Sequence, residues 1–132
     1  MKLIDQEKAR NLRTWLEALR SGEYRQNIDG ILGNHEGGFC CLGVACKVLD
    51  LEFDWNAQIL PELPDYIGLY DEEGNVKDGS IIFGDTGLVY SSLIEANDSG
   101  NVDFDEIADA IEENLIDFVE PAVAKLYKDG AF

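Results

Sequence analysis

Apolar residues recur at helical spacing near both ends of the chain, whereas the middle is interrupted by glycine, proline and short polar runs. From residue 6 to 20 the apolar positions are three or four apart, which places them on one side of a helix. Asp5 can cap this helix, and Ser21 and Gly22 can end it. The pattern therefore predicts a first helix over residues 6–20. Its apolar side consists of Ala9, Leu12, Trp15, Leu16 and Leu19.

The segments that follow predict one buried helix among loops. Residues 27–38 contain four glycines and fit either a short hairpin or an irregular loop. Residues 39–51 are apolar on nearly every side, which predicts a short helix buried on most of its surface. Gly43 within it indicates the close approach of a neighbouring segment.

Residues 52–90 are rich in turn formers and predict loops with little regular structure. We expect one short turn of helix near Asp65. The pairs 69–70 and 75–76 flank a turn sequence at 71–74 and resemble a hairpin, and residues 81–83 are a strand candidate. A small antiparallel sheet follows from these elements.

The last third carries the clearest helical pattern. Residues 88–96 suit a helix that residues 97–100 would end, and Asp103 with Glu106 three positions later forms a capping-box sequence. A second helix is predicted from there to residue 119, where Pro121 breaks it, and residues 122–128 can form a final turn or two. Its apolar side consists of Phe104, Ile107, Ala108, Ile111, Leu115, Phe118 and Val119.

These elements predict a single α+β domain over residues 1–132, with about four helices packed against a small antiparallel sheet or hairpin. A length of 132 residues with 45% apolar composition is typical of one globular domain. No window approaches the roughly 18 uninterrupted apolar residues of a membrane span, so we expect a cytoplasmic protein without membrane contact. Three closely spaced cysteines indicate reduced thiols.

The charge is large and unevenly distributed. The formal net charge is -17 at pH 7. Residues 1–25 carry six basic and four acidic side chains, a net +2, and residues 26–132 carry four basic and 23 acidic ones, a net -19. Such a field repels nucleic acid and favours cationic partners, although it also serves solubility alone. The basic face of the first helix is either solvated or packed beside the acidic half; it contains Lys8, Arg10, Arg13 and Arg20.

The cysteine run at residues 39–46 is the first candidate for chemistry. Cys40 or Cys41 would lie at a helix N-terminus, where the helix dipole lowers a thiol pKa, and His35 is the single imidazole in the chain. A cysteine-dependent hydrolase is therefore one alternative. The run is apolar, however, and His35 lacks an evident orienting partner, so small core residues are the favoured interpretation. The spacing of His35, Cys41 and Cys46 also fits zinc poorly.

Residues 95–106 are similar to a calcium-binding EF-hand loop, with Gly100 at the sixth place and Glu106 at the twelfth. The first place departs from the motif, because Glu95 stands where aspartate is preferred. A capped corner between two helices explains the same residues, so calcium binding is a second alternative and no cofactor is expected. The calcium ligands would be Glu95, Asn97, Ser99, Asn101, Asp103 and Glu106.

The same corner is similar to a DNA-binding helix-turn-helix, but the exposed face of its second helix is acidic and would be repelled by phosphates. Direct binding of nucleic acid is therefore excluded. We predict instead that this face binds a partner protein. The predicted partner-binding residues are Glu106, Asp109, Glu112 and Glu113.

Three blocks of the sequence resemble, in order, a family of small bacteriophage and prophage proteins. The blocks are residues 15–24, residues 40–46 and residues 97–109, the last with one additional residue between Gly100 and Phe104. The resemblance implies a phage accessory protein in the cytoplasm of the infected host, and it brings no activity with it. Together with the acidic charge it predicts a non-enzymatic protein that binds and modulates a host protein, such as a nucleic-acid-binding defence protein, by acting as a DNA mimic.

Overall fold

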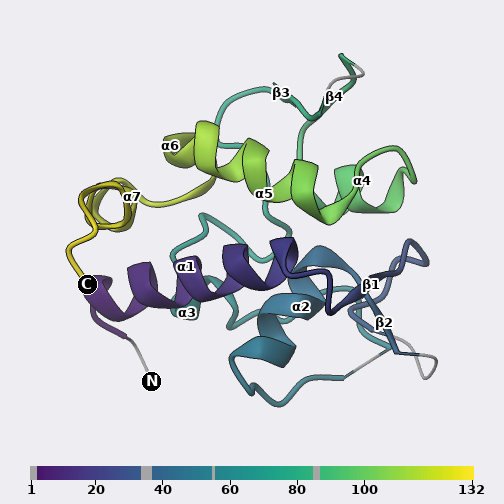
Figure 1. The fold of residues 1–132 in the computed structure, drawn as a ribbon, viewed down its shortest axis with the longest axis horizontal. Helices are drawn as coiled ribbons and strands as arrows, with labels where there is room; N and C mark the ends of the chain where they lie inside the picture. The colour runs from purple at the N-terminus through teal and green to yellow at the C-terminus, as the bar shows by residue number, and fades with distance from the viewer. Residues whose placement is uncertain (1–2, 34–36, 55, 85–86) are drawn as a thin grey trace.

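The structure is a computed structural model that describes residues 3–33, 37–54, 56–84 and 87–132. Figure 1 shows α1 crossing the molecule, with α5 and α6 on one side of it and α2 and α3 on the other. The α+β class is confirmed, with four helices of eight residues or more and two small sheets of two strands each. The elements are α1 (Asp5–Arg20), β1 (Arg25–Gln26), β2 (Gly38–Phe39), α2 (Cys41–Val48), α3 (Pro64–Ile67), β3 (Ile81–Ile82), β4 (Val89–Tyr90), α4 (Leu93–Asp98), α5 (Phe104–Glu113), α6 (Leu115–Phe118) and α7 (Pro121–Asp129).

Helix α1 is the element around which the others pack. Its apolar side is buried as predicted, and the helix contacts α2, α3, α5 and α7. Asp5 is not its cap: Ile4 occupies the N-cap position, and Asp5 lies in the first turn, where a carboxylate interacts favourably with the helix dipole. The predicted end is confirmed, since Ser21 is the C-cap and its hydroxyl donates to the Ala18 carbonyl at 2.7 Å.

Residues 27–38 form a loop and not a hairpin, as far as they are described. The two ends of the loop meet side by side in the same direction, so that β1 and β2 pair in parallel, with Arg25 opposite Gly38. Helix α2 follows at once and is buried along most of its length. Gly43 lies so close to the Leu32 carbonyl that a β-carbon would collide with it, which confirms the predicted close approach.

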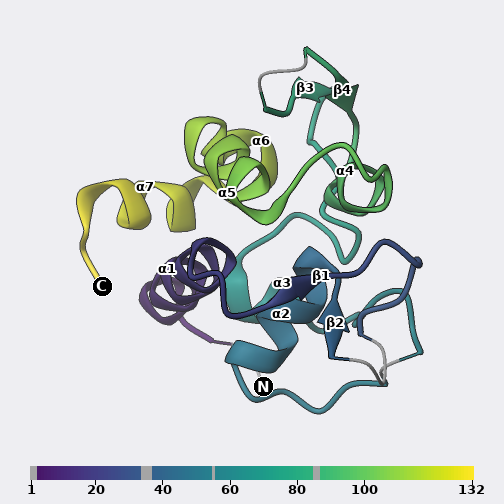
Figure 2. The same cartoon turned by 45° about the vertical axis from the view of Figure 1, so that its right-hand side comes forward.

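The predicted short helix near Asp65 is α3, and the strand candidate at 81–83 is β3. β3 pairs antiparallel with β4, so the small antiparallel sheet is also confirmed. Figure 2 shows this β3–β4 hairpin standing out from the helices, with β3 on the side toward α5 and α6. No helix among the described residues is both long enough and apolar enough to cross a bilayer.

Three sequence predictions in the second half are wrong in their boundaries or partners. The flanks of the 71–74 turn do not pair with each other, because Leu69 pairs with Val119 and Asn75 with Ser92. The helix expected over 88–96 begins only at Leu93, where the Ser92 hydroxyl accepts from the Glu95 N–H, while residues 89–90 are strand.

The third is the helix expected over 104–119, which is interrupted at Asn114. The backbone of Asn114 leaves helical geometry at φ −129° and ψ 43°, and its side-chain amide donates to the Ala110 carbonyl at 2.9 Å. Asparagine forms such local bonds in competition with the helix ladder. α6 then continues to Phe118, and Pro121 begins α7 as the predicted break.

Candidate functional site

The N-terminus of α5 is built by the capping box that the sequence predicted. The Asp103 carboxylate accepts from the Glu106 N–H at 2.9 Å, and the Glu106 carboxylate accepts from the Asp103 N–H at 3.1 Å. Because both side chains are turned back toward the backbone, α5 begins at a defined residue and its later carboxylates have fixed positions along the helix.

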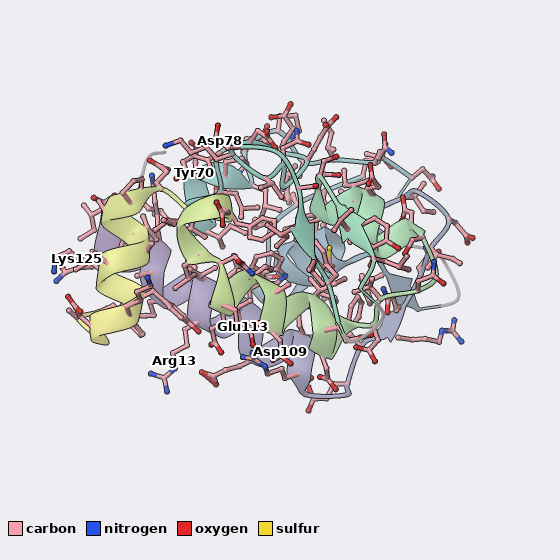
Figure 3. The ribbon with its side chains drawn as sticks, turned by 90° about the horizontal axis from the view of Figure 1, so that it is seen from above. Arg13, Tyr70, Asp78, Asp109, Glu113 and Lys125 are labelled. Carbon is pink, nitrogen blue, oxygen red and sulfur yellow. The ribbon has the colours of Figure 1, made fainter. Side chains whose placement is uncertain are left out.

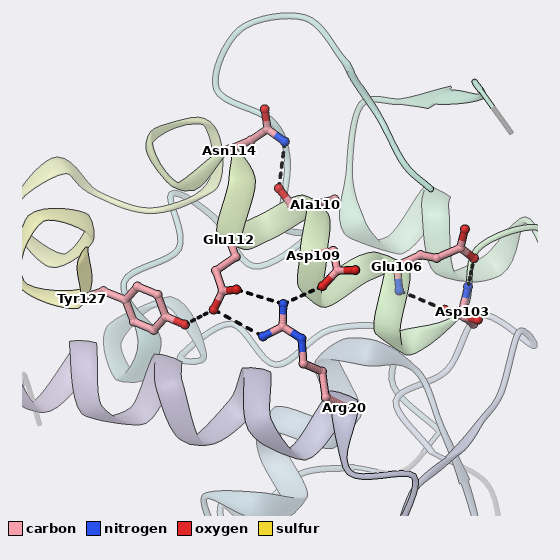
Figure 4. A network of polar contacts seen from close by, with 8 residues as sticks. All are labelled: Arg20, Asp103, Glu106, Asp109, Ala110, Glu112, Asn114 and Tyr127. Carbon is pink, nitrogen blue, oxygen red and sulfur yellow. Dashed lines mark hydrogen bonds and ion pairs between the residues drawn. The ribbon is translucent and has the colours of Figure 1, made fainter. Parts of the chain in front are cut away.

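The middle of α5 is joined to α1 by a charged network (Figure 4). Arg20 reaches from the end of α1 and contacts Asp109 at 2.7 Å and Glu112 at 3.0 Å. The phenol of Tyr127, on α7, donates to Glu112. Three helices thereby meet at Glu112, which bonds to both Arg20 and Tyr127. Of the predicted basic face of α1, Arg20 packs here beside the acidic half of the chain, and buried Lys8 pairs with Glu120 at 3.7 Å. Arg10 and Arg13 are exposed.

The acidic face predicted to bind a partner therefore also has a structural role, through Asp109 and Glu112. Burial alone would raise the pKa of Glu112, but the hydrogen bonds from Tyr127 and Arg20 hold that pKa below its usual value. Burial, together with the bond to Glu112, raises the pKa of Tyr127. Neutralising Asp109 and Glu112 would therefore remove partners of Arg20, and a stabilising effect is not expected.

The other side of α5 borders a groove of about 500 Å³ between this helix and β3. Asp109 and Glu113, which project from neighbouring turns of α5 (Figure 3), line it together with Glu106. The groove is lined by Ile81, Ile82, Gly84, Glu106, Asp109, Ala110, Glu113 and Asn114. Three of the four predicted partner-binding residues thus share one concave surface, whereas Glu112 is directed toward Arg20 and Tyr127.

The groove combines negative charge with exposed aliphatic surface. Glu113 is exposed, and no ion pair joins it to any residue that the structure describes. Ile82 is 59% exposed, and Val89, its partner across the hairpin, is 55% exposed. At the other end the Glu106 carboxylate lies against Gly84, where any β-carbon would collide with it. We call this surface, from Glu106 and Gly84 to Glu113 and Ile82, the acidic groove.

The cysteine candidates lie elsewhere and are inaccessible. Cys40 is the N-cap of α2, where its sulfur accepts from the Gly43 N–H, and the Cys41 thiol donates to the Leu93 carbonyl. Burial raises the pKa of Cys40 to about 11 and that of Cys46 to about 12, and it holds the pKa of Cys41 well above its ordinary value. A thiol nucleophile needs the opposite shift and access to solvent. His35 lies outside the described residues.

The calcium candidates do not converge on one point. Asn97 is fully buried, and its amide oxygen accepts from the Gln26 side chain and the Cys41 N–H. The Ser99 hydroxyl donates to the Ala96 carbonyl, and the carboxylates of Asp103 and Glu106 cap α5. The remaining candidates, Glu95 and Asn101, belong to the same capped corner. Among the described residues no group of three or more histidine, cysteine or acidic side chains is placed to hold a metal ion.

Residues 7–75 match the sequence model of a family described as a domain of unknown function, DUF8296. The chain belongs to this family. The match extends from α1 past α3 and includes two of the three sequence blocks described above, whereas α5 and the acidic groove of this DUF8296 protein lie beyond it. No curated protein and no solved structure matches the chain.

The sequence reasoning missed two parts of this site. It did not connect Tyr127 with Glu112, because a contact between α7 and α5 depends on the break at Asn114 and the turn at Pro121. It also did not place β3 beside α5. The one signal in the sequence for a contact with α5 was the basic face of the first helix, because packed basic side chains require acidic neighbours.

Proposed function

We propose that this DUF8296 protein is a non-enzymatic binding protein whose partner is a protein with a basic surface. In its specific form, the proposal is a bacteriophage accessory protein that occupies the nucleic-acid-binding surface of a host defence protein. Carboxylates on a folded surface can take the place of phosphates, and charge complementarity accelerates and orients such association.

The observation that carries the proposal is the acidic groove. Glu106, Asp109 and Glu113 come from successive turns of one helix and border a concave surface with exposed aliphatic side chains. Interfaces between proteins commonly combine an apolar centre with charged groups at the rim. The alternatives gain no such support, since the three thiols are buried and the calcium candidates bond to one another and to the backbone.

The test is capture of proteins from a bacterial lysate by the immobilised chain, at low and at high salt. We expect a captured protein that is released by salt and by double-stranded DNA added as a competitor. Glu113→Gln should weaken capture, whereas Glu62→Gln, an equal change of charge at an exposed site beside α3, should not. Equal capture by the two variants, or capture that is insensitive to salt and DNA, would contradict the proposal.

A further inference from the structure

The β3–β4 hairpin has backbone groups that point away from its own pairing. The Phe83 N–H donates to the Leu88 carbonyl at 3.0 Å, and Ile81 lies opposite Tyr90. Hydrogen-bonded and non-hydrogen-bonded pairs alternate in an antiparallel ladder, so Ile82 and Val89 form a non-hydrogen-bonded pair. Their N–H and C=O groups are therefore directed outward, those of Ile82 along the β3 edge and those of Val89 along the β4 edge.

The β3 edge borders the acidic groove. Among the described residues, β3 has no strand neighbour other than β4. On its other side the groove separates Ile81, Ile82 and Gly84 from α5, and its volume of about 500 Å³ is within the range that holds ligands. An unpaired strand edge next to a concave surface is the arrangement to which extended peptides add as a further strand.

The chemistry of the groove indicates what kind of segment it accepts. Glu106, Asp109 and Glu113 are spaced along α5 at roughly 4.5 and 6 Å of helical rise. Side chains on one face of an extended strand recur about every 6.7 Å, which is close to the rise from Asp109 to Glu113. Two successive basic residues of one face can therefore meet these two carboxylates, of which Asp109 also contacts Arg20. Side chains on the other face would lie beside Ile82, which is exposed and aliphatic.

We propose that an extended segment of a protein partner, with basic residues alternating with aliphatic ones, binds in the acidic groove as a third strand on the β3 edge. This inference rests on the proposed function and names the mode of recognition. A second copy of the chain is a poorer occupant, because its own acidic groove and a net charge of -17 would oppose the approach of the first.

The test uses the full chain and a short synthetic peptide of alternating lysine and valine, titrated at low salt by calorimetry and by amide NMR. Two further peptides have the same sequence and charge, with N-methyl groups on every lysine or on every valine. Only alternate N–H groups of a strand face its neighbour, so methylation of one set should weaken binding about tenfold and methylation of the other set much less. Whether methylation of the lysines or of the valines weakens binding also shows whether the added strand runs parallel or antiparallel to β3.

A pair of proline variants locates the edge. Ile82→Pro removes the outward N–H of β3 without removing a bond of the hairpin, and Val89→Pro makes the same change on β4. We expect Ile82→Pro to lose the roughly tenfold preference between the peptides and Val89→Pro to keep it. If Ile82→Pro does not fold, the comparison of methylated peptides on the unchanged protein still decides the matter.

The other outcomes separate the two proposals. Equal affinity for all three peptides, or equal loss for both methylated ones, overturns strand addition and leaves acidic recognition in place. Strand addition on the β3 edge is also overturned if Val89→Pro, and not Ile82→Pro, loses the preference between the methylated peptides. It is overturned as well if the chain forms a dimer that Ile82→Pro disrupts. Absence of binding by any of the peptides at low salt overturns the inference together with the acidic recognition on which it rests.

Discussion

Helices α2 and α5 both contain the residues from which chemistry was predicted, and they differ in how much of their surface the fold covers. α2 is buried from Cys41 to Cys46, and its cysteines lie in the core with raised pKa values. α5 buries one side, and its carboxylates remain on the other. Reactive groups in a fully covered helix are available only for packing, whereas groups on a half-covered helix can contact both the fold and a partner.

Two kinds of acidic residue lie side by side within α5. Glu112 accepts from Arg20 and Tyr127 and belongs to the fold, while Glu113, the next residue, borders the acidic groove. Adjacent positions on a helix point about 100° apart, so neighbours in sequence can serve different purposes.

The largest effect is expected for Gly43→Ala in α2. The added methyl group would collide with the Leu32 backbone, which no rotation of a side chain relieves, so we expect a loss of at least about 3 kcal/mol in the free energy of unfolding. Chemical denaturation measures it. Gly79→Ala is the control: it has open space but a φ of 80°, and should lose roughly 1 kcal/mol. Similar losses for the two would show that the Leu32 contact is relaxed in solution.

Alkaline pH should destabilise the protein through the same helix. The pKa of Cys40 is raised to about 11 and that of Cys46 to about 12, so the unfolded thiols ionise first. The stability that the neutral thiols contribute is fully present below about pH 8.5 and falls as the pH rises above it. Up to about pH 10, ionisation of tyrosine adds little to this loss. Urea denaturation between pH 7 and 10 measures the slope.

Cys40→Ala and Cys46→Ala test whether these thiols cause the alkaline loss. Each should lower the free energy of unfolding by about 1 to 2 kcal/mol at neutral pH, because a buried sulfur is removed. Each should also make the free energy of unfolding fall less steeply between pH 7 and 10. Fast alkylation of the folded protein at pH 7 would contradict this assignment and revive the hydrolase alternative.

A smaller effect is expected where α5 meets α1. Arg20→Met should lower stability by about 1 kcal/mol, less at high salt, because the network is partly exposed. Arg10→Met is the control, since Arg10 is exposed and makes no ion pair among the described residues. An equal effect of Arg20→Met and Arg10→Met in thermal denaturation would show that the network does not stabilise the fold.

The network should also weaken at acid pH. The pKa of Glu112 is lowered, so the stability that Glu112 contributes is present above about pH 4.3 and is lost as the pH falls through the folded pKa.

The smallest effect is expected for Glu113→Gln, within about 0.5 kcal/mol and toward greater stability, because a repulsive charge is removed. Glu112→Gln, one residue away, should instead lose about 1 kcal/mol with its bonds to Arg20 and Tyr127. Denaturation of both variants in parallel measures the difference. A loss in Glu113→Gln as large as that in Glu112→Gln would mean that the acidic groove is also part of the folded scaffold.

Local features of the fold were readable from the sequence because they depend on residues a few positions apart. The capping box of Asp103 and Glu106, the end of α1 at Ser21 and the buried sides of α1 and α5 are of this kind. The close approach at Gly43 was also predictable, since glycine inside an apolar helix is typical of a tight packing contact. The acidic character of α5 followed from composition and helical period alone.

Only the tertiary structure decided which of these features meet. Arg20 and Glu112 are 92 positions apart, and Asn97 bonds to Gln26 and Cys41 from distant segments. The pairing of Leu69 with Val119 has the same origin. Such contacts depend on how whole elements pack against one another. The packing energy is the sum of many small contacts between distant residues, which no short stretch of sequence contains. The chain therefore specified by itself an acidic α+β domain with buried thiols. The fold decided that Glu112 holds Arg20, that Glu113 borders the acidic groove and that Asp109 does both.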